Sequence, residues 1–175
     1  SLVILLFFLQ NFSFSQNQGR VESLENELKN HSARKLELKL ASPSLYDTTA
    51  VNILNSLYVE YRGSDLDKAM DYINQCLTLS EQIGYKKGTG NAYSGMAAIL
   101  IRRGDFLNAL DFSKRALKIR LEIGDKRGIA GSYNDMGIIY YDQGNYPEAL
   151  KNYLAALKIK EVVGDKQGIA NGYGN

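Results

Sequence analysis

The chain has 175 residues, a formal net charge of +2 and a hydrophobic content of 45%, which fits one folded domain or a short array of repeats. It contains one histidine, His31, and one cysteine, Cys76, so it cannot assemble a zinc site of three or four Cys/His ligands or an internal disulfide. The near balance of charge gives no indication of a nucleic-acid partner, and we expect none.

Residues 1–15 begin with an uncharged apolar run from Ser1 to Leu9. A helix needs about 20 residues to cross a bilayer, so this run is too short to span one. Its length fits the hydrophobic part of a secretory signal, and Ser13-Phe14-Ser15 fits the small-x-small pattern of a cleavage site. We expect 1–15 to be a signal peptide, truncated at its start, that exports the protein to the periplasm or the extracytoplasmic face of a bacterial membrane. The alternative is a buried core strand or helix.

Residues 16–47 are expected to form one helix and a linker. Apolar residues recur at helical spacing from Val21 through Leu28 to Leu40. Ser42-Pro43-Ser44 then separates this helix from the sequence that follows. We expect the helix to cover the first of the repeats described next.

The rest of the chain repeats with a period of 40 residues. Full units span residues 48–87, 88–127 and 128–167, and a truncated fourth unit begins at 168–175. Two series of glycines mark the period: Gly84, Gly124 and Gly164, and Gly88, Gly128 and Gly168. Each unit is predicted to contain two helices, because its apolar residues recur at spacings of three and four.

The third unit indicates how its two helices are bounded. Gly144 ends the first helix, and Asn145 caps the second, with Glu148 completing a capping box. Pro147 falls in the first turn, where a missing N–H costs little. The second helix then carries an apolar stripe that we expect to be buried: Tyr146, Ala149, Leu150, Tyr153, Ala156 and Leu157.

Helix caps also recur at the boundaries between units. Gly124 and Gly164 suit the left-handed residue after a helix, and Asp125 and Asp165 follow as caps of the next helix. The first unit ends in Gly84-Tyr85 instead, so we expect a weaker cap there.

This pattern resembles the tetratricopeptide repeat (TPR). The third unit matches the family's signature at Tyr133, Met136, Gly137 and Tyr140 in its first helix, and at Gly144, Tyr146, Ala149, Tyr153 and Ala156 around its second. The second unit matches at most of the same positions, whereas the first is degenerate, with Leu57 and Glu60 as departures. The resemblance is to the long type of exported bacterial TPR sensor and scaffold proteins. It implies an all-α solenoid of antiparallel helix pairs in a right-handed superhelix.

The resemblance also implies a concave groove, lined by the first helix of each unit, that holds a peptide segment of a partner. Its positions in this sequence are Tyr58, Tyr61, Asn91, Ser94, Ala98, Ile101, Asn134, Ile138 and Tyr141. No lysine or arginine is among them, so we do not expect the clamp that some relatives use for a C-terminal carboxylate. The set favours a peptide held by side-chain burial, with Asn91 and Asn134 bonding its backbone.

Positive charge is concentrated in the second unit, which has eight Lys or Arg residues against four Asp or Glu. Lys114, Arg115, Lys118 and Arg120 lie on its second helix, which the resemblance places on the outer, convex side. They form either a solvated helix face or a docking patch for an acidic partner.

We expect no enzyme activity, no catalytic residue, no metal and no cofactor. Carboxylates are scattered without an acid–base pair on one helix face, Cys76 occupies a small core position, and His31 is expected to be solvated. The predicted function is a protein-interaction scaffold, the N-terminal sensory part of a longer exported signalling protein. It would meet a membrane only through a segment outside this chain. The alternatives are a cytoplasmic adaptor of co-chaperone type and a helical-repeat enzyme.

Overall fold

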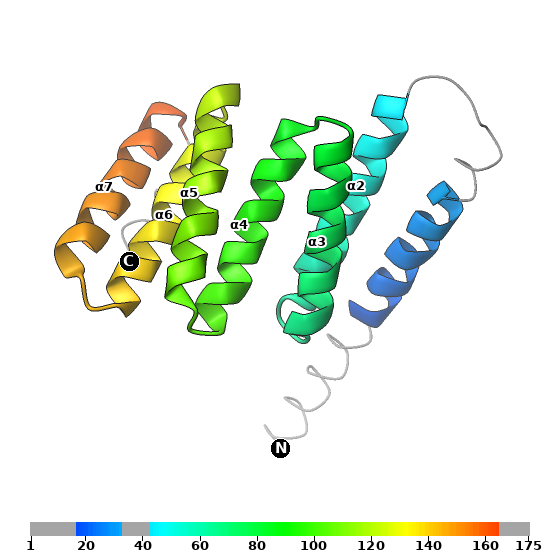
Figure 1. Cartoon of the computed structure of the whole chain (residues 1–175), viewed down its shortest axis with the longest axis horizontal. Coiled ribbons are helices and arrows are strands. Elements are labelled where there is room, and N and C mark those ends of the chain that lie inside the picture. The colour runs from blue at the N-terminus through cyan, green and yellow to red at the C-terminus, as the bar shows by residue number, and fades with distance from the viewer. Residues whose placement is uncertain (1–16, 33–42, 165–175) are drawn as a thin grey trace, which may run out of the picture.

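The computed structural model describes residues 17–32 and 43–164, which are helical throughout except at the turns (Figure 1). A helix over residues 17–32 comes first. Six helices follow it: α2 (Pro43–Tyr61), α3 (Leu66–Gln82), α4 (Lys86–Arg102), α5 (Phe106–Ile123), α6 (Lys126–Asp142) and α7 (Tyr146–Val162). The predicted all-α solenoid is confirmed. The predicted signal peptide over 1–15, the second half of the first helix and the cap Asp165 lie outside the described residues.

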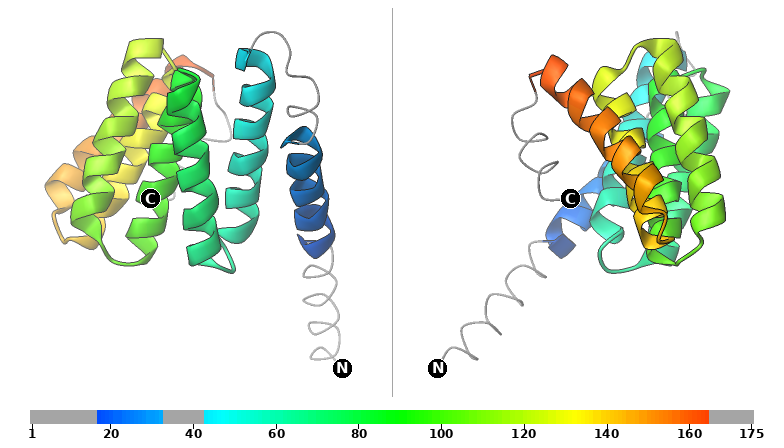
Figure 2. Two further views of the ribbon diagram at one scale, coloured as in Figure 1. Left: turned by 45° about the vertical axis from the view of Figure 1, so that its right-hand side comes forward. Right: turned by 90° about the vertical axis from the view of Figure 1, so that its left-hand side faces the viewer.

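The six helices pack as three consecutive pairs: α2 with α3, α4 with α5, and α6 with α7 (Figure 1). The members of a pair run antiparallel, because a turn of a few residues joins them. Helix α4 also contacts both α2 and α6, whereas α3, α5 and α7 make no contact with one another within the described chain. The first helices of the pairs therefore lie closest together, on the inner side of the stack. Figure 2 shows the same succession of pairs from two other directions.

The turns and caps follow the repeat. Asp125 and Asn145 cap α6 and α7 as predicted, accepting hydrogen bonds from the backbone N–H of Gly128 at 3.0 Å and of Glu148 at 3.4 Å. Tyr85 supplies no side-chain cap, also as predicted. Five glycines have φ between 67° and 76°, a left-handed conformation that only glycine adopts without strain: Gly84, Gly104, Gly124, Gly144 and Gly164.

The capping box predicted at α7 is only half formed. The Asn145 side chain accepts its bond, but the Asn145 backbone N–H donates to the Tyr140 carbonyl at 2.8 Å. The Glu148 carboxylate pairs instead with Lys151 at 3.2 Å. The prediction is wrong in this half, because the glycine turn already satisfies the N–H that the glutamate was expected to bind.

Small residues let the two helices of a pair approach closely. Gly137 of α6 is buried, and a methyl group added to it would lie 2.6 Å from the ring of Tyr153 on α7. Only glycine therefore admits that ring at this distance. The small residues that begin the second helices are at most 3% exposed: Ala69, Ala109 and Ala149.

The apolar stripe predicted on α7 is buried only in part. Ala149 is buried, but Tyr146 and Leu150 are 62% and 59% exposed, so the expectation of burial is wrong for these two residues. Their counterparts in α5, Phe106 and Leu110, are partly buried, and α5 is followed and contacted by α6. No helix of the described chain follows α7, so the side of α7 that corresponds to the side of α5 facing α6 is not covered by another described helix.

The helix over residues 17–32 packs against the first pair, as expected. Arg20 forms an ion pair with Glu60 of α2 at 2.9 Å. Glu25 accepts hydrogen bonds from the hydroxyls of Tyr61 on α2 and Tyr72 on α3, at 3.2 and 2.8 Å. These contacts join the first helix to both members of the pair.

Candidate peptide-binding surface

Seven of the nine predicted groove residues lie together on α4 and α6, on the inner side of the stack. Six of them are partly exposed: Asn91, Ser94, Ala98, Ile101, Asn134 and Ile138. The seventh, Tyr141, is 55% exposed, and its ring meets that of Tyr146 edge-on with centroids 5.5 Å apart. This set of seven residues is called the inner face below.

The two predicted residues of α2 lie differently. Tyr61 stacks on Tyr72 with ring centroids 5.5 Å apart and donates to Glu25, so it faces the helix over residues 17–32. We therefore leave Tyr61 out of the inner face. Tyr58 is 5% exposed, and its ring packs against Gly95, where an added methyl group would lie 3.1 Å from the ring carbon Cζ.

A buried arginine from α5 lies under the inner face. Arg120 is 8% exposed, and its guanidinium donates to the hydroxyls of Ser94 at 2.7 Å and Ser132 at 2.8 Å. It also donates to the Gly128 carbonyl at 3.0 Å and the Asn91 side-chain oxygen at 3.4 Å. One side chain therefore links α4, α5 and α6, and it holds two of the predicted groove residues, Asn91 and Ser94.

The burial of Arg120 corrects the expectation that it lies on the outer side. Lys114, Arg115 and Lys118 are exposed as expected, whereas Arg120 points inward between the helix pairs. Glycine makes room for it, because a methyl group on Gly128 would lie 2.7 Å from Arg120 Cδ. A buried cation is tolerated where hydrogen bonds replace its water, as the four oxygen acceptors do here.

Asp135 of α6 balances the charge of this arginine. Burial raises the pKa of Asp135 to about 6, and the charge of Arg120 opposes that rise. Burial likewise lowers the pKa of Arg120, opposed by Asp135 and Asp125. Arg120 Nε has no hydrogen-bond partner in the described chain. The polar network under the inner face therefore changes its net charge near pH 6.

A signal for this network is present in the sequence, although the motif analysis missed it. At three positions, the residue in the second or third unit is larger or more polar than the residue 40 positions earlier in the chain. The replacements are Ser80 by Arg120, Ala92 by Ser132, and Gly95 by Asp135. A joint change at three positions that the fold brings together indicates a contact between them.

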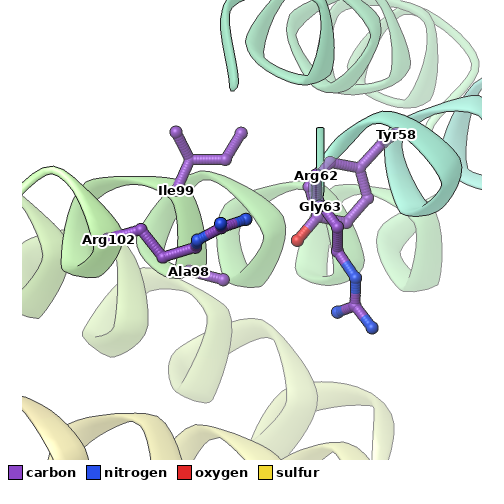
Figure 3. A pocket seen from close by; sticks show the side chains of 6 residues that line it. All are labelled: Tyr58, Arg62, Gly63, Ala98, Ile99 and Arg102. Carbon is purple, nitrogen blue, oxygen red and sulfur yellow. The ribbon is translucent and has the colours of Figure 1, made fainter. Parts of the chain in front are cut away.

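A pocket of about 260 Å³ lies between α2 and α4 (Figure 3), lined by Tyr58, Arg62, Gly63, Ala98, Ile99 and Arg102. Figure 3 shows the Arg102 side chain extending toward the Tyr58 hydroxyl, with Arg62 beside the same ring. Burial raises the pKa of Tyr58, and both arginines oppose that rise. The pocket therefore presents a protonated hydroxyl and two cations. Neither arginine is among the predicted groove residues, because Arg62 and Arg102 lie one helical turn after the groove residues Tyr58 and Ala98.

The reactive side chains singled out in the sequence lie away from these sites. Cys76 is fully buried, as predicted, and burial raises its pKa to about 11, which makes its thiol a poor nucleophile. His31, expected to be solvated, is partly buried on the helix over residues 17–32. The described residues hold no group of three or more His, Cys, Asp or Glu placed to bind a metal ion. None of the described helices combines the length and apolarity that crossing a bilayer requires.

Models of two related families match overlapping parts of the chain. One, described as tetratricopeptide repeat, matches residues 88–161. The other, described as the SusR N-terminal TPR domain, matches residues 22–115, which is more than half of the chain. No match to a curated protein was found.

Solved structures similar to this chain include the following two. BtubC (BKLC) from P. vanneervenii has a TM-score of 0.72 and 18% identity, over 90% of this chain and 63% of that one. A Signal Transduction ATPase with Numerous Domains (STAND) protein with a tetratricopeptide repeat sensor, from Pyrococcus horikoshii, has a TM-score of 0.61 and 23% identity. That match covers 87% of this chain and 25% of the STAND protein. At these identities the likeness shows the fold alone.

Proposed function

This chain belongs to the tetratricopeptide repeat family, and on that basis we propose that it is a protein-interaction scaffold that binds a peptide segment of a partner on the inner face. The observation that carries the proposal is a stripe of partly exposed apolar and amide side chains on two neighbouring helices: Ala98 and Ile101 on α4, and Asn134 and Ile138 on α6. Apolar groups at these positions are available to bury peptide side chains.

The polar groups of the inner face divide into two kinds. Asn91 and Ser94 are engaged by Arg120, so they form a fixed floor. The Asn134 side chain makes no hydrogen bond within the described chain, so its donor and its acceptor are both available to a peptide backbone. A fixed floor supports affinity, because a binding surface that is already ordered loses less entropy when the peptide arrives.

We further propose that the chain is the sensory part of a longer exported protein. The match to the SusR N-terminal TPR domain and the signal-like sequence of residues 1–15 support export. The similar STAND protein has a tetratricopeptide repeat sensor, which supports a sensory role for this chain by analogy. This chain spans 63% and 25% of the two similar structures, so longer relatives of this fold exist.

A displayed library of random 12-residue peptides tests the binding proposal. Peptides selected on the 175-residue chain should lose at least tenfold in affinity for the double variant Ile101→Asp/Ile138→Asp, because a carboxylate in an apolar contact is left desolvated. The matched control is Leu107→Asp/Leu121→Asp, which makes the same apolar-to-carboxylate change at two exposed positions of α5.

The control should bind the selected peptides within about twofold, and both variants should melt like the parent chain. Loss of binding in the outer-side variant with retention in the inner-face variant would overturn the proposal. The same conclusion would follow if the library yielded no binder.

A further inference from the structure

We propose that the pocket between α2 and α4 is a carboxylate-binding subsite, which takes an Asp or Glu side chain of the bound peptide. This inference rests on the proposed function and adds the chemistry of one peptide residue to it. The subsite consists of the Arg62 and Arg102 guanidinium groups, the Tyr58 hydroxyl, and an apolar wall from Ala98 and Ile99.

Its position continues the inner face. Ala98 belongs to the inner face and also lines the pocket, so a peptide lying on α4 reaches the pocket without leaving that helix. Arg62 and Arg102 are 40 residues apart and so occupy the same position in successive units. Each follows an inner-layer residue by one turn, Tyr58 in one case and Ala98 in the other, which brings the two cations to the same edge of the stack.

Neither cation is neutralised within the described chain. The neighbouring Arg103 pairs with Asp67 of α3, but no carboxylate pairs with Arg62 or Arg102. Two guanidinium groups beside one pocket repel each other, and an anion between them relieves that repulsion. Guanidinium matches a carboxylate geometrically, because two of its N–H groups can bind both oxygens.

The hydroxyl completes the donor set. The Tyr58 hydroxyl has an ordinary pKa of 10.0, which burial raises further, so it is protonated at neutral pH and can donate to an oxygen of the ligand. Tyr58 is held in place by close packing against Gly95, since a methyl group on Gly95 would lie 3.1 Å from Tyr58 Cζ. Ile73 belongs to the same buried cluster as Tyr58.

The surroundings favour a single negative charge over a phosphate dianion. The charge of Asp135 acts on Tyr58 and raises its pKa, so a carboxylate already contributes negative potential at the pocket. The third unit has Asp142 where the first two have Arg62 and Arg102, so the positive edge ends after α4. A pocket of about 260 Å³ also has room for an acidic side chain with its water.

A double-mutant cycle with an amidated peptide from the library tests the subsite. Arg102→Gln should weaken binding of the acidic peptide by about tenfold, the scale of one charge-assisted hydrogen bond. The same variant should bind the Asp→Asn or Glu→Gln form of that peptide as the parent chain does. Arg62→Gln should behave alike, and Tyr58→Phe should cause a smaller loss. Arg103→Gln is the matched control and should change affinity by less than twofold.

Equal losses of affinity for the acidic peptide and its amide form would overturn the subsite. The arginines would then stabilise the ends of their helices without contacting the peptide carboxylate. Dependence on a free C-terminal carboxylate instead of the side chain would overturn it as well, as would tighter competition by inorganic phosphate than by acetate. In each of these cases the proposed function stands if Ile101→Asp/Ile138→Asp still weakens binding of the peptide. Loss of that effect removes the proposed function itself.

Discussion

At the scale of single residues, Arg120 is the position where local sequence and final environment differ most. Its neighbours Lys114 and Lys118 are exposed, and nothing within its own helix marks it as buried. Its environment comes from Ser94 and Ser132, which are 26 and 12 residues away in the chain. Such a residue stabilises the stack only as long as its partners remain, because an unpaired buried polar group is costly.

Arg120→Ala should lower the free energy of unfolding by about 3 kcal/mol or more, because each buried acceptor left without its charged donor costs about 1–3 kcal/mol. The change leaves two hydroxyls and Asp135 without the guanidinium and opens a cavity between α4 and α6. Urea unfolding followed by circular dichroism measures the loss. Lys118→Ala, on the exposed side of the same helix, should stay within about 0.5 kcal/mol of the parent. Similar values for the two variants would contradict the role given to Arg120.

Asp135 should make stability depend on pH. Its pKa in the folded chain is about 6, above the ordinary value of 3.8, so the folded state binds the proton more tightly than the unfolded state. Its contribution to stability is therefore greatest below about pH 4 and declines as the pH rises to 6, by at most about 3 kcal/mol. Asp135→Asn should remove that decline, so the variant should gain on the parent between pH 4 and pH 7.

Urea unfolding at both pH values measures the effect, and Asp71→Asn, an exposed change on α3, is the control. Parallel stability curves for the parent and Asp135→Asn would contradict the assignment.

At the scale of helices, the boundaries follow from short-range signals, which is why they could be predicted. A glycine in the left-handed region follows each helix from α3 to α7. An Asp or Asn side chain caps α3, α5, α6 and α7. Contacts between helices could not be predicted in the same way. Tyr61 was expected in the groove, but Glu25 and Tyr72 hold it on another side, and neither contact has a local signature.

Asp125→Ala should lower the free energy of unfolding by about 1 kcal/mol, because α6 loses the oxygen that accepts from the Gly128 N–H at 3.0 Å. The lost charge also faced the positive end of the helix dipole. Asp111→Ala, an exposed change in the middle of α5, is the comparison and should have less effect. Thermal melts of both variants measure the difference, and an Asp125 variant as stable as the Asp111 variant would refute the cap.

At the scale of the whole molecule, the 40-residue period predicted the architecture, because each pair of helices buries its apolar side only on its neighbours. The period did not predict at which equivalent positions of the repeats the side chains differ in burial. Tyr146 and Leu150 are exposed on α7, although Phe106 and Leu110 are partly buried in the pair before it. The proposed carboxylate-binding subsite could not be predicted for a related reason. Arg62 and Arg102 look like ordinary charged helix ends until α2 and α4 are placed side by side.

The central claim is that a peptide binds on the inner face, and methyl NMR with labelled isoleucines tests it most directly. A selected peptide titrated into the 175-residue chain should shift the δ1-methyl signals of Ile101 and Ile138. The signal of Ile123, which lies 37% exposed on α5, should stay unchanged. Shifts confined to Ile123 and the other isoleucines of α5 and α7, with Ile101 and Ile138 unchanged, would contradict the claim.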